Sequence, residues 1–153
     1  MPRLLGSLGY PGFAYLRDPE TVANPAAVLL AALQQPAVSA RVTAALPWLL
    51  ATFTNLDWDW LVDEAKRSNL QNRLGYLVTV ATELASKRGE TTALAALREA
   101  ERHLEDARLV REDTLGRSLT EAERRYLRTH RPDAAAHWNV LTSLSANDLP
   151  DAL

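Results

Sequence analysis

The stretch Leu70-Gln-Asn-Arg-Leu-Gly-Tyr-Leu-Val-Thr-Val-Ala-Thr-Glu-Leu-Ala85 carries the clearest structural signal in this chain of 153 residues. Its apolar residues recur at the three- and four-residue spacing of one helix face, and Tyr76 with Val80 adds a second apolar side. A helix that is apolar on two sides is usually central to a bundle. Gly75 in its interior costs about 1 kcal/mol relative to alanine unless a close helix crossing needs it. The main stripe consists of Leu70, Leu74, Leu77, Val78, Ala81, Leu84 and Ala85.

Three helical patterns precede this stretch. Asn24-Pro25 places a capping residue before a proline at the first helical position, and Pro36 ends the helix that follows. A second helix is predicted over residues 37–53, where Pro47 kinks it or splits it into two short helices. Asp57 then caps a third helix.

Further helices are predicted after the stretch. Residues 91–108 form a highly charged amphipathic pattern. Ser118-x-x-Glu121 and Thr120-x-x-Glu123 are alternative capping boxes for a helix that runs through His130. Pro132 opens a last helix, because proline is favoured in the first turn. This last helix carries Ala135, Trp138, Leu141 and, off that stripe, Leu144.

Residues 1–23 differ from the rest, because glycines and prolines break both helical and strand patterns there. We read this segment as an extended arm that docks its aromatic side chains on the body, or as a linker from a longer parent protein. Residues 24–153 then form a single helical domain. The sequence therefore predicts an all-α fold, an irregular bundle of six to seven helices with an extended N-terminal arm.

Composition excludes several classes of function. The chain has no cysteine, which removes disulfides, thiolate zinc sites and cysteine nucleophiles and favours an intracellular protein. The net charge of −2 gives no overall attraction to nucleic acid or anionic lipid. Its longest apolar run, residues 42–53, is too short to span a bilayer. No targeting segment is evident, so a cytoplasmic location without membrane insertion is expected.

No catalytic motif is found. The G-x-S-x-G elbow and the phosphate-binding loop are both missing. Acidic residues gather near Asp59, with Asp63 one turn away, but acids are typical of a helix N-terminus. His130, Asp133 and His137 lie close in sequence, yet a proline interrupts the helix between them. An enzyme using either group is the least favoured hypothesis, and no cofactor or metal is expected.

Arginines form a stripe between residues 117 and 131. This segment has five arginines and two glutamates, a net charge of +3, and could contact phosphates or an acidic protein surface. The alternative is an ordinary solvated face with Glu121 paired to the arginine four residues on. A helix-turn-helix over residues 119–144 is disfavoured because its second helix has no arginine. The stripe consists of Arg117, Arg124, Arg128 and Arg131, with Arg125 beside it.

Trp60 is the best indication of a partner. Trp58 belongs to the buried stripe of its helix, so Trp60 points about 200° away from that stripe. A tryptophan off the core face is either covered by the arm or exposed as an interface anchor. The side chains best placed in sequence to cover it are Tyr10, Phe13 and Tyr15, which we group with it as partner-binding candidates.

Two short motifs, Leu46-Pro-Trp-Leu49 and Asn72-Arg-Leu-Gly-Tyr-Leu77, carry a resemblance to known proteins. The chain resembles the helical C-terminal effector domains of bacterial helix-turn-helix regulators and antitoxins of the AbiE type. That resemblance implies contact with another protein and no catalysis, and the winged helix that binds DNA in such regulators is missing from this chain. We therefore predict a non-enzymatic protein–protein interaction or regulatory module of a bacterial transcription regulator or antitoxin. Its partner would be another protein or a second copy, with nucleic-acid binding by the arginine stripe as the alternative.

Overall fold

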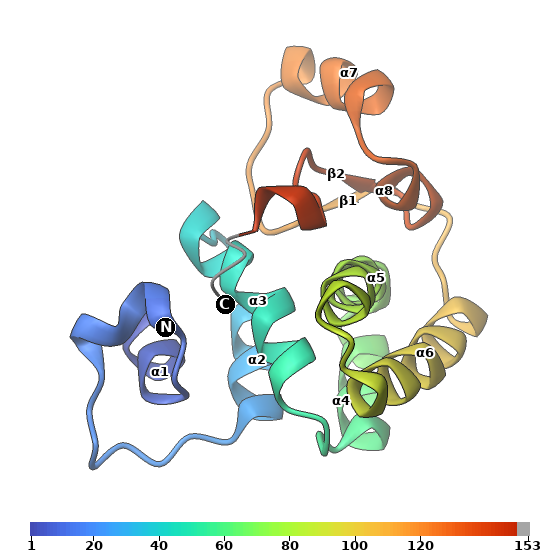
Figure 1. Cartoon of the computed structure of the whole chain (residues 1–153). Helices are drawn as coiled ribbons and strands as arrows, with labels where there is room; N and C mark the ends of the chain where they lie inside the picture. Colours follow the sequence, from blue (N-terminus) through green and yellow to red (C-terminus); the bar gives the residue numbers. More distant parts are fainter. Residues whose placement is uncertain (150–153) are drawn as a thin grey trace.

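The computed structural model describes residues 1–149, which form an irregular all-α fold with one very short pair of strands (Figure 1). The predicted fold class is confirmed. The elements in chain order are α1 (Pro2–Ser7), the 3-10 helix η1 (Pro11–Leu16), α2 (Pro25–Gln34), α3 (Ala40–Thr52), α4 (Trp58–Arg67), α5 (Gln71–Arg88), α6 (Thr91–Asp106), β1 (Asp113–Thr114), α7 (Glu121–His130), α8 (Asp133–His137), β2 (Val140–Leu141) and the 3-10 helix η2 (Ala146–Asp148).

Helix α5 is the centre of the fold, as its two apolar sides predict. Eleven of its eighteen residues are buried. It packs against α3 and α6 in the helical body and also against α8 and both strands of the C-terminal part. Figure 1 shows α5 enclosed by the other helices. The central position of α5 therefore follows from the burial of both its apolar sides against other helices and strands.

Gly75 of α5 makes room for an aromatic ring. A Cβ atom added at Gly75 would lie 2.5 Å from Cζ3 of Trp138, well inside van der Waals contact. Trp138 is fully buried, and its indole N–H donates a hydrogen bond of 3.0 Å to Oγ1 of Thr79. The glycine is thus needed because Trp138, at the C-terminal end of α8, packs directly on α5. The sequence had suggested a close helix crossing as the reason for this glycine.

The polar residues of α5 hold the C-terminal segment on the body. The buried side chain of Asn72 donates to the backbone oxygen of Leu109 and accepts from its N–H, both at 2.7 Å. Arg73 pairs with Asp113 at 2.8 Å. Tyr76 donates its hydroxyl hydrogen to the backbone oxygen of Leu144, and burial raises the pKa of Tyr76. The motif that carries the family resemblance is therefore structural in this fold.

Helix α3 is continuous through its proline. Ser39 caps it by accepting from the N–H of Val42, and the helix runs from Ala40 to Thr52 with Pro47 inside. Of the two alternatives expected at Pro47, a kink or a split into two helices, the split is not observed. Pro47 is buried against the rest of the core, so tertiary packing offsets the lost backbone hydrogen bond.

The N-terminal segment is not extended between residues 2 and 16, which corrects the prediction. Pro2 and Pro11 each occupy the first turn of a helix, α1 and η1. The two helices pack so closely that a Cβ atom on Gly6 would lie 2.3 Å from the backbone oxygen of Phe13. Glycine and proline here start and pack short helices, a use that sequence pattern alone does not reveal.

The predicted last helix is also shorter than expected. It ends as α8 at His137, and Asn139 then takes a left-handed backbone conformation with φ of 55°. Val140–Leu141 follow as β2, which pairs in parallel with β1. Leu141 and Leu144, which were expected within this helix, thus lie beyond it. None of the helices in the described part of the chain has the length and apolar character needed to cross a bilayer.

Candidate functional site

Helix α7 stands apart from the helical body at one end of the molecule (Figure 1). Thr120 and Glu123 form its capping box, which decides between the two boxes that the sequence offered. The helix has ten residues, and none of them is buried. Capping and side-chain pairs on the surface therefore hold it in place, and burial contributes little.

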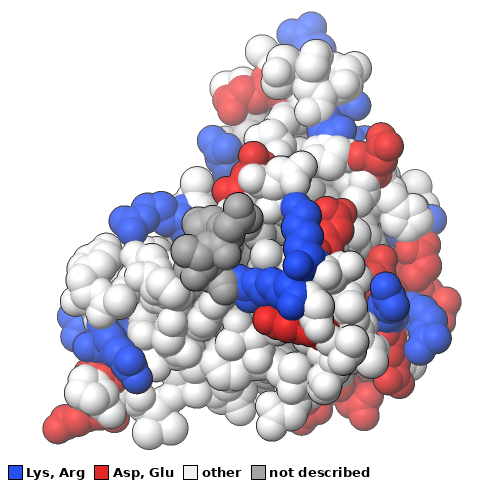
Figure 2. All heavy atoms as spheres, in the orientation of Figure 1, with Lys and Arg blue, Asp and Glu red and all other residues white. Residues whose placement is uncertain are grey.

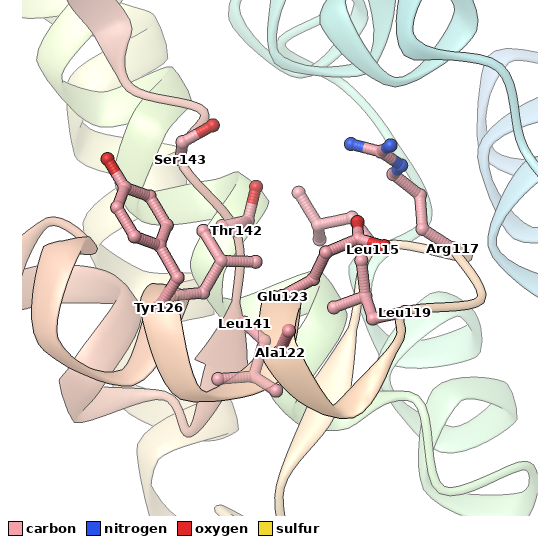
Figure 3. A pocket seen from close by; sticks show the side chains of 10 residues that line it. Leu115, Arg117, Leu119, Ala122, Glu123, Tyr126, Leu141, Thr142 and Ser143 are labelled. Carbon is pink, nitrogen blue, oxygen red and sulfur yellow. The ribbon is translucent and has the colours of Figure 1, made fainter.

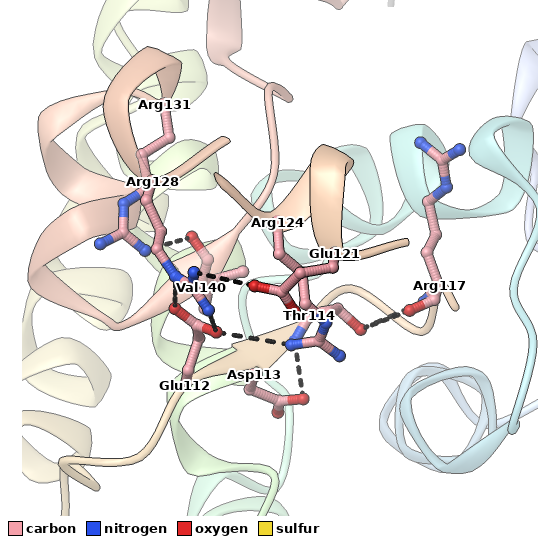
Figure 4. A network of polar contacts seen from close by, with 9 residues as sticks. All are labelled: Glu112, Asp113, Thr114, Arg117, Glu121, Arg124, Arg128, Arg131 and Val140. Atoms are coloured by element: carbon pink, nitrogen blue, oxygen red, sulfur yellow. Dashed lines mark hydrogen bonds and ion pairs between the residues drawn. The ribbon is translucent and has the colours of Figure 1, made fainter. Parts of the chain in front are cut away.

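Glu112 anchors α7 to the segment before it. Its carboxylate accepts two hydrogen bonds from Arg128, at 2.9 and 3.0 Å, and one from Arg124 at 3.4 Å (Figure 4). The hydrogen bond from Arg128 and the charges of the neighbouring arginines lower the pKa of Glu112. Arg128 also pairs with Glu121 at 3.6 Å. Two positive charges of the arginine stripe are thus balanced within the fold.

The other arginines of the stripe lie in different surroundings. Arg117 precedes α7 and is not on its face, while the exposed Arg125 is on the helix. Arg131 donates a hydrogen bond of 3.2 Å to the backbone oxygen of Val140. Figure 2 shows positive and negative side chains interspersed on the visible face of this end of the molecule. The predicted stripe of five arginines is therefore not one continuous basic face.

Two aromatic rings stack on the surface of α7. Tyr126 and His130 lie one helical turn apart, with ring centroids separated by 4.1 Å and planes inclined by 5°. The imidazole Nδ1 lies 2.9 Å from the backbone oxygen of Tyr126 and 2.8 Å from the hydroxyl of Thr129. Tyr126 is 59% exposed. The stack thus holds an exposed tyrosine ring against the imidazole ring at the surface of α7.

A pocket of about 370 Å³ opens beside this stack. We call it the α7 pocket. In Figure 3, Tyr126 and Arg117 stand on opposite sides of it. Leucine side chains cover much of its wall, and hydroxyl groups of the segment after β2 lie at its edge. The lining residues are Leu115, Arg117, Leu119, Ala122, Glu123, Tyr126, Leu127, Leu141, Thr142 and Ser143.

The aromatic partner-binding candidates are not brought together. Tyr10 and Phe13 are buried, and the Tyr10 ring packs edge-on against Trp48 with a centroid separation of 5.3 Å. These two aromatic side chains thus dock on the body, as expected of the N-terminal segment, but they pack at Trp48 of α3 and not over Trp60. Trp60, at 39%, and Tyr15 on η1, at 71%, both belong to the exposed large apolar side chains of the described residues, so of the two alternatives for Trp60 the structure shows the exposed one.

The acidic and histidine candidates also lie apart. Asp57 caps α4 by accepting from the N–H of Trp60, while Asp59 and Asp63 line a groove between α4 and α6. His130 bonds within α7, and His137 pairs with Glu105 of α6. Within residues 1–149, no group of three or more His, Asp or Glu side chains is arranged to hold a metal ion.

The tyrosine of α7 and the pocket beside it were missed by sequence reasoning. The signal was present, because Ala122 and Tyr126 stand four residues apart on one face of the predicted helix, with Leu127 beside them. Comparison with known protein families, with curated proteins and with solved structures finds no match to this chain.

Proposed function

We propose that the chain is a non-enzymatic interaction module that docks a partner protein through α7. The observation that carries the proposal is a capped and ion-paired helix that has no fully buried residue and presents a tyrosine that is 59% exposed. A helix that adds so little to the core leaves its side chains available for contact. The stacked His130 fixes the Tyr126 ring, which lowers the entropy that docking must overcome.

The chemistry of this surface suits a protein partner. Tyrosine and arginine are enriched among residues whose truncation weakens interfaces most. Tyr126, Arg125 and His130 lie within two turns of one helix, so they offer such residues at a single place. Phosphate binding gains less support, because Glu112 already engages Arg124 and Arg128. Recognition by an acidic nucleic-acid backbone would have to break these pairs.

The same proposal includes the biological setting expected from the sequence, a regulatory module of a bacterial transcription regulator or antitoxin in the cytoplasm. Its support is the short resemblance around Asn72-Arg-Leu-Gly-Tyr-Leu77, and its partner would be another protein or a second copy of the chain. A toxin or regulator protein is accordingly the first type of partner to seek among captured proteins.

The test is a pull-down from source-cell lysate with the immobilised chain, run with and without nuclease. Tyr126→Ala should lose the partner while its free energy of unfolding changes by no more than about 0.5 kcal/mol, as for a surface residue outside the core. Tyr15→Ala is the matched control, because Tyr15 is even more exposed and lies on η1. Trp60→Ala tests the surface expected from the sequence alone.

Each result assigns the surface. Capture that survives nuclease and disappears only in Tyr126→Ala supports docking through α7. Capture that disappears in Trp60→Ala or Tyr15→Ala instead would contradict it and restore the earlier prediction. Recovery that nuclease abolishes would favour the nucleic-acid alternative, which Arg117→Gln combined with Arg125→Gln should then weaken.

A further inference from the structure

The α7 pocket is built from three separate segments of the chain. The loop after β1 supplies Leu115 and Leu119, α7 supplies Leu127, and β2 supplies Leu141. Leu115 and Leu141 are buried, so the floor of the pocket belongs to the rigid part of the fold. A ligand resting there would remove from water the apolar surface that the half-buried Leu119 and Leu127 still expose, which is favourable.

Arg117 supplies the positive charge of the pocket lining. Its backbone is fixed at both ends of the residue, because its N–H donates to Oγ1 of Thr114 at 3.2 Å and its backbone oxygen accepts from the same hydroxyl at 3.0 Å. Figure 3 shows its guanidinium group directed away from the floor, at the opposite side from Tyr126. Among the residues that the structure describes, no carboxylate forms an ion pair with Arg117.

Glu123 is the other charged residue of the lining, and its carboxylate has a role already. One of its oxygens, Oε1, accepts hydrogen bonds from the N–H and the hydroxyl of Thr120 as part of the capping box. It also lies in the first turn of α7, where the helix dipole stabilises negative charge. Among the described residues no ion pair joins Arg117 and Glu123, so the guanidinium group is not neutralised by the carboxylate of the same pocket.

The geometry points to a small amphipathic acid as the ligand of this pocket, with an apolar body on the leucine floor and its acid group on Arg117. Sites for small molecules have volumes of roughly 300–1,000 Å³ and combine mainly apolar walls with a few polar groups that set orientation. The α7 pocket, at about 370 Å³, has this size and this distribution of groups. The assignment goes beyond the proposed docking function and does not depend on it.

A ligand in this pocket would also act on α7. Leu127 and Tyr126 face the pocket from the helix, and α7 itself buries none of its side chains in the free protein. Filling the pocket therefore adds contacts to a helix that has no fully buried residue. The bound acid should slow amide hydrogen exchange in α7 and leave exchange in α5 unchanged.

Octanoate and octanol are matched probes, because they share an apolar chain and differ in the acid group. Titration of the full chain with octanoate should saturate at one site, and Arg117→Gln should weaken its binding about tenfold, the loss expected for one charge-assisted hydrogen bond. Octanol should bind the variant and the unchanged chain alike. Arg125→Gln is the charge-matched control and should leave both affinities unchanged.

A second pair of variants locates the binding site. Ala122 is exposed on α7 and lines the pocket, so Ala122→Phe fills the pocket without entering the core and should abolish binding of both probes. Ala95→Phe places the same ring on the exposed side of α6 and should change nothing. Because these titrations contain no partner protein, they succeed or fail independently of the pull-down.

Two results would overturn the assignment. Probe binding that persists in Ala122→Phe would place the ligand elsewhere on the protein. Equal octanoate affinity in Arg117→Gln and the unchanged chain would show that Arg117 does not bind the acid group. The pocket would then be an apolar groove for a segment of the partner protein. The expected pattern is selective loss of octanoate in Arg117→Gln together with loss of both probes in Ala122→Phe.

Discussion

Helices α5 and α7 are stabilised in opposite ways. Helix α5 has no side-chain cap at its N-terminus but buries eleven of its eighteen residues. Helix α7 has a complete capping box, ion pairs at Glu112 and no buried residue. Tertiary packing therefore holds α5, whereas local interactions hold α7. The comparison indicates which helix maintains the fold and which one is available for binding.

The same contrast extends to the polar groups of each helix. On α5, Asn72 and Tyr76 are buried and bonded to backbone groups of the C-terminal segment. On α7, the ring of Tyr126 stacks on His130 at the surface. Truncating a side chain of α5 should therefore cost stability, whereas truncating one of α7 should cost binding.

The largest effect is expected where α5 receives the ring of Trp138. Trp138→Ala should lower the free energy of unfolding by about 3–5 kcal/mol, because it empties a fully buried site. Gly75→Ala should also destabilise, by about 1–3 kcal/mol, because the new methyl group overlaps the ring. Urea denaturation followed by circular dichroism measures both changes.

The double variant sharpens this prediction. Once Trp138→Ala has removed the ring, Gly75→Ala meets no obstacle and should stabilise α5 by up to about 1 kcal/mol through helix propensity. The sign of the Gly75→Ala effect should thus reverse between the two backgrounds. An unchanged sign would mean that the glycine serves something other than the ring.

A smaller effect is expected from the cap of α7. Thr120→Ala removes the hydroxyl that accepts from the N–H of Glu123 and should destabilise the helix by about 1 kcal/mol. Because no residue of α7 is fully buried, the cap is a main source of its local stability. Amide exchange in α7 should therefore accelerate in this variant, while exchange in α5 stays unchanged. Asn24→Ala, at the cap of α2, is the control, since α2 is packed into the core.

The smallest effect concerns the ion pairs at Glu112. The pKa of this carboxyl is lowered in the folded protein, chiefly by the hydrogen bond from Arg128. Its contribution is therefore present above the ordinary carboxyl pKa of about 4.3 and is lost as the pH falls through the lowered value. In an NMR titration from pH 5 downward, the backbone shifts of α7 should change only below about pH 4.3, where Glu112 becomes protonated.

The variant Glu112→Gln should remove this acid-dependent change and weaken the attachment of α7 already at neutral pH. Glu99→Gln is the control, because it changes the net charge by the same amount and lies on the exposed side of α6, away from α7. An acid transition of α7 that is identical in Glu112→Gln and in the unchanged chain would assign it to another carboxyl group.

Part of this picture could be predicted from the sequence because its causes are local. The caps at Asn24, Asp57 and Thr120 depend on residues one to three positions away, and the apolar sides of α5 are a property of that helix alone. The fold class follows from such signals. The sequence contained two possible capping boxes for α7, however, and only the structure shows that Thr120 and Glu123 form the cap.

The remaining features depend on distant contacts. Pro47 stays inside α3 because the core packs around it. A glycine is needed at position 75 because the ring of Trp138, sixty-three positions later in the chain, packs against it. The prediction of an arginine stripe required one continuous helix over residues 117–131, but Arg117 precedes α7. In addition, Glu112, in the connection between α6 and β1, forms ion pairs with Arg124 and Arg128. Sequence pattern carries no information about these pairings, because tertiary structure creates them.

The central claim is that α7 docks the partner, and hydrogen–deuterium exchange of the free chain and of its captured complex tests it most directly. The account predicts rapid exchange in α7 of the free chain, strong protection of α7 in the complex and unchanged exchange in α5. Protection confined to α4 around Trp60, with α7 exchanging as rapidly as before, would contradict it.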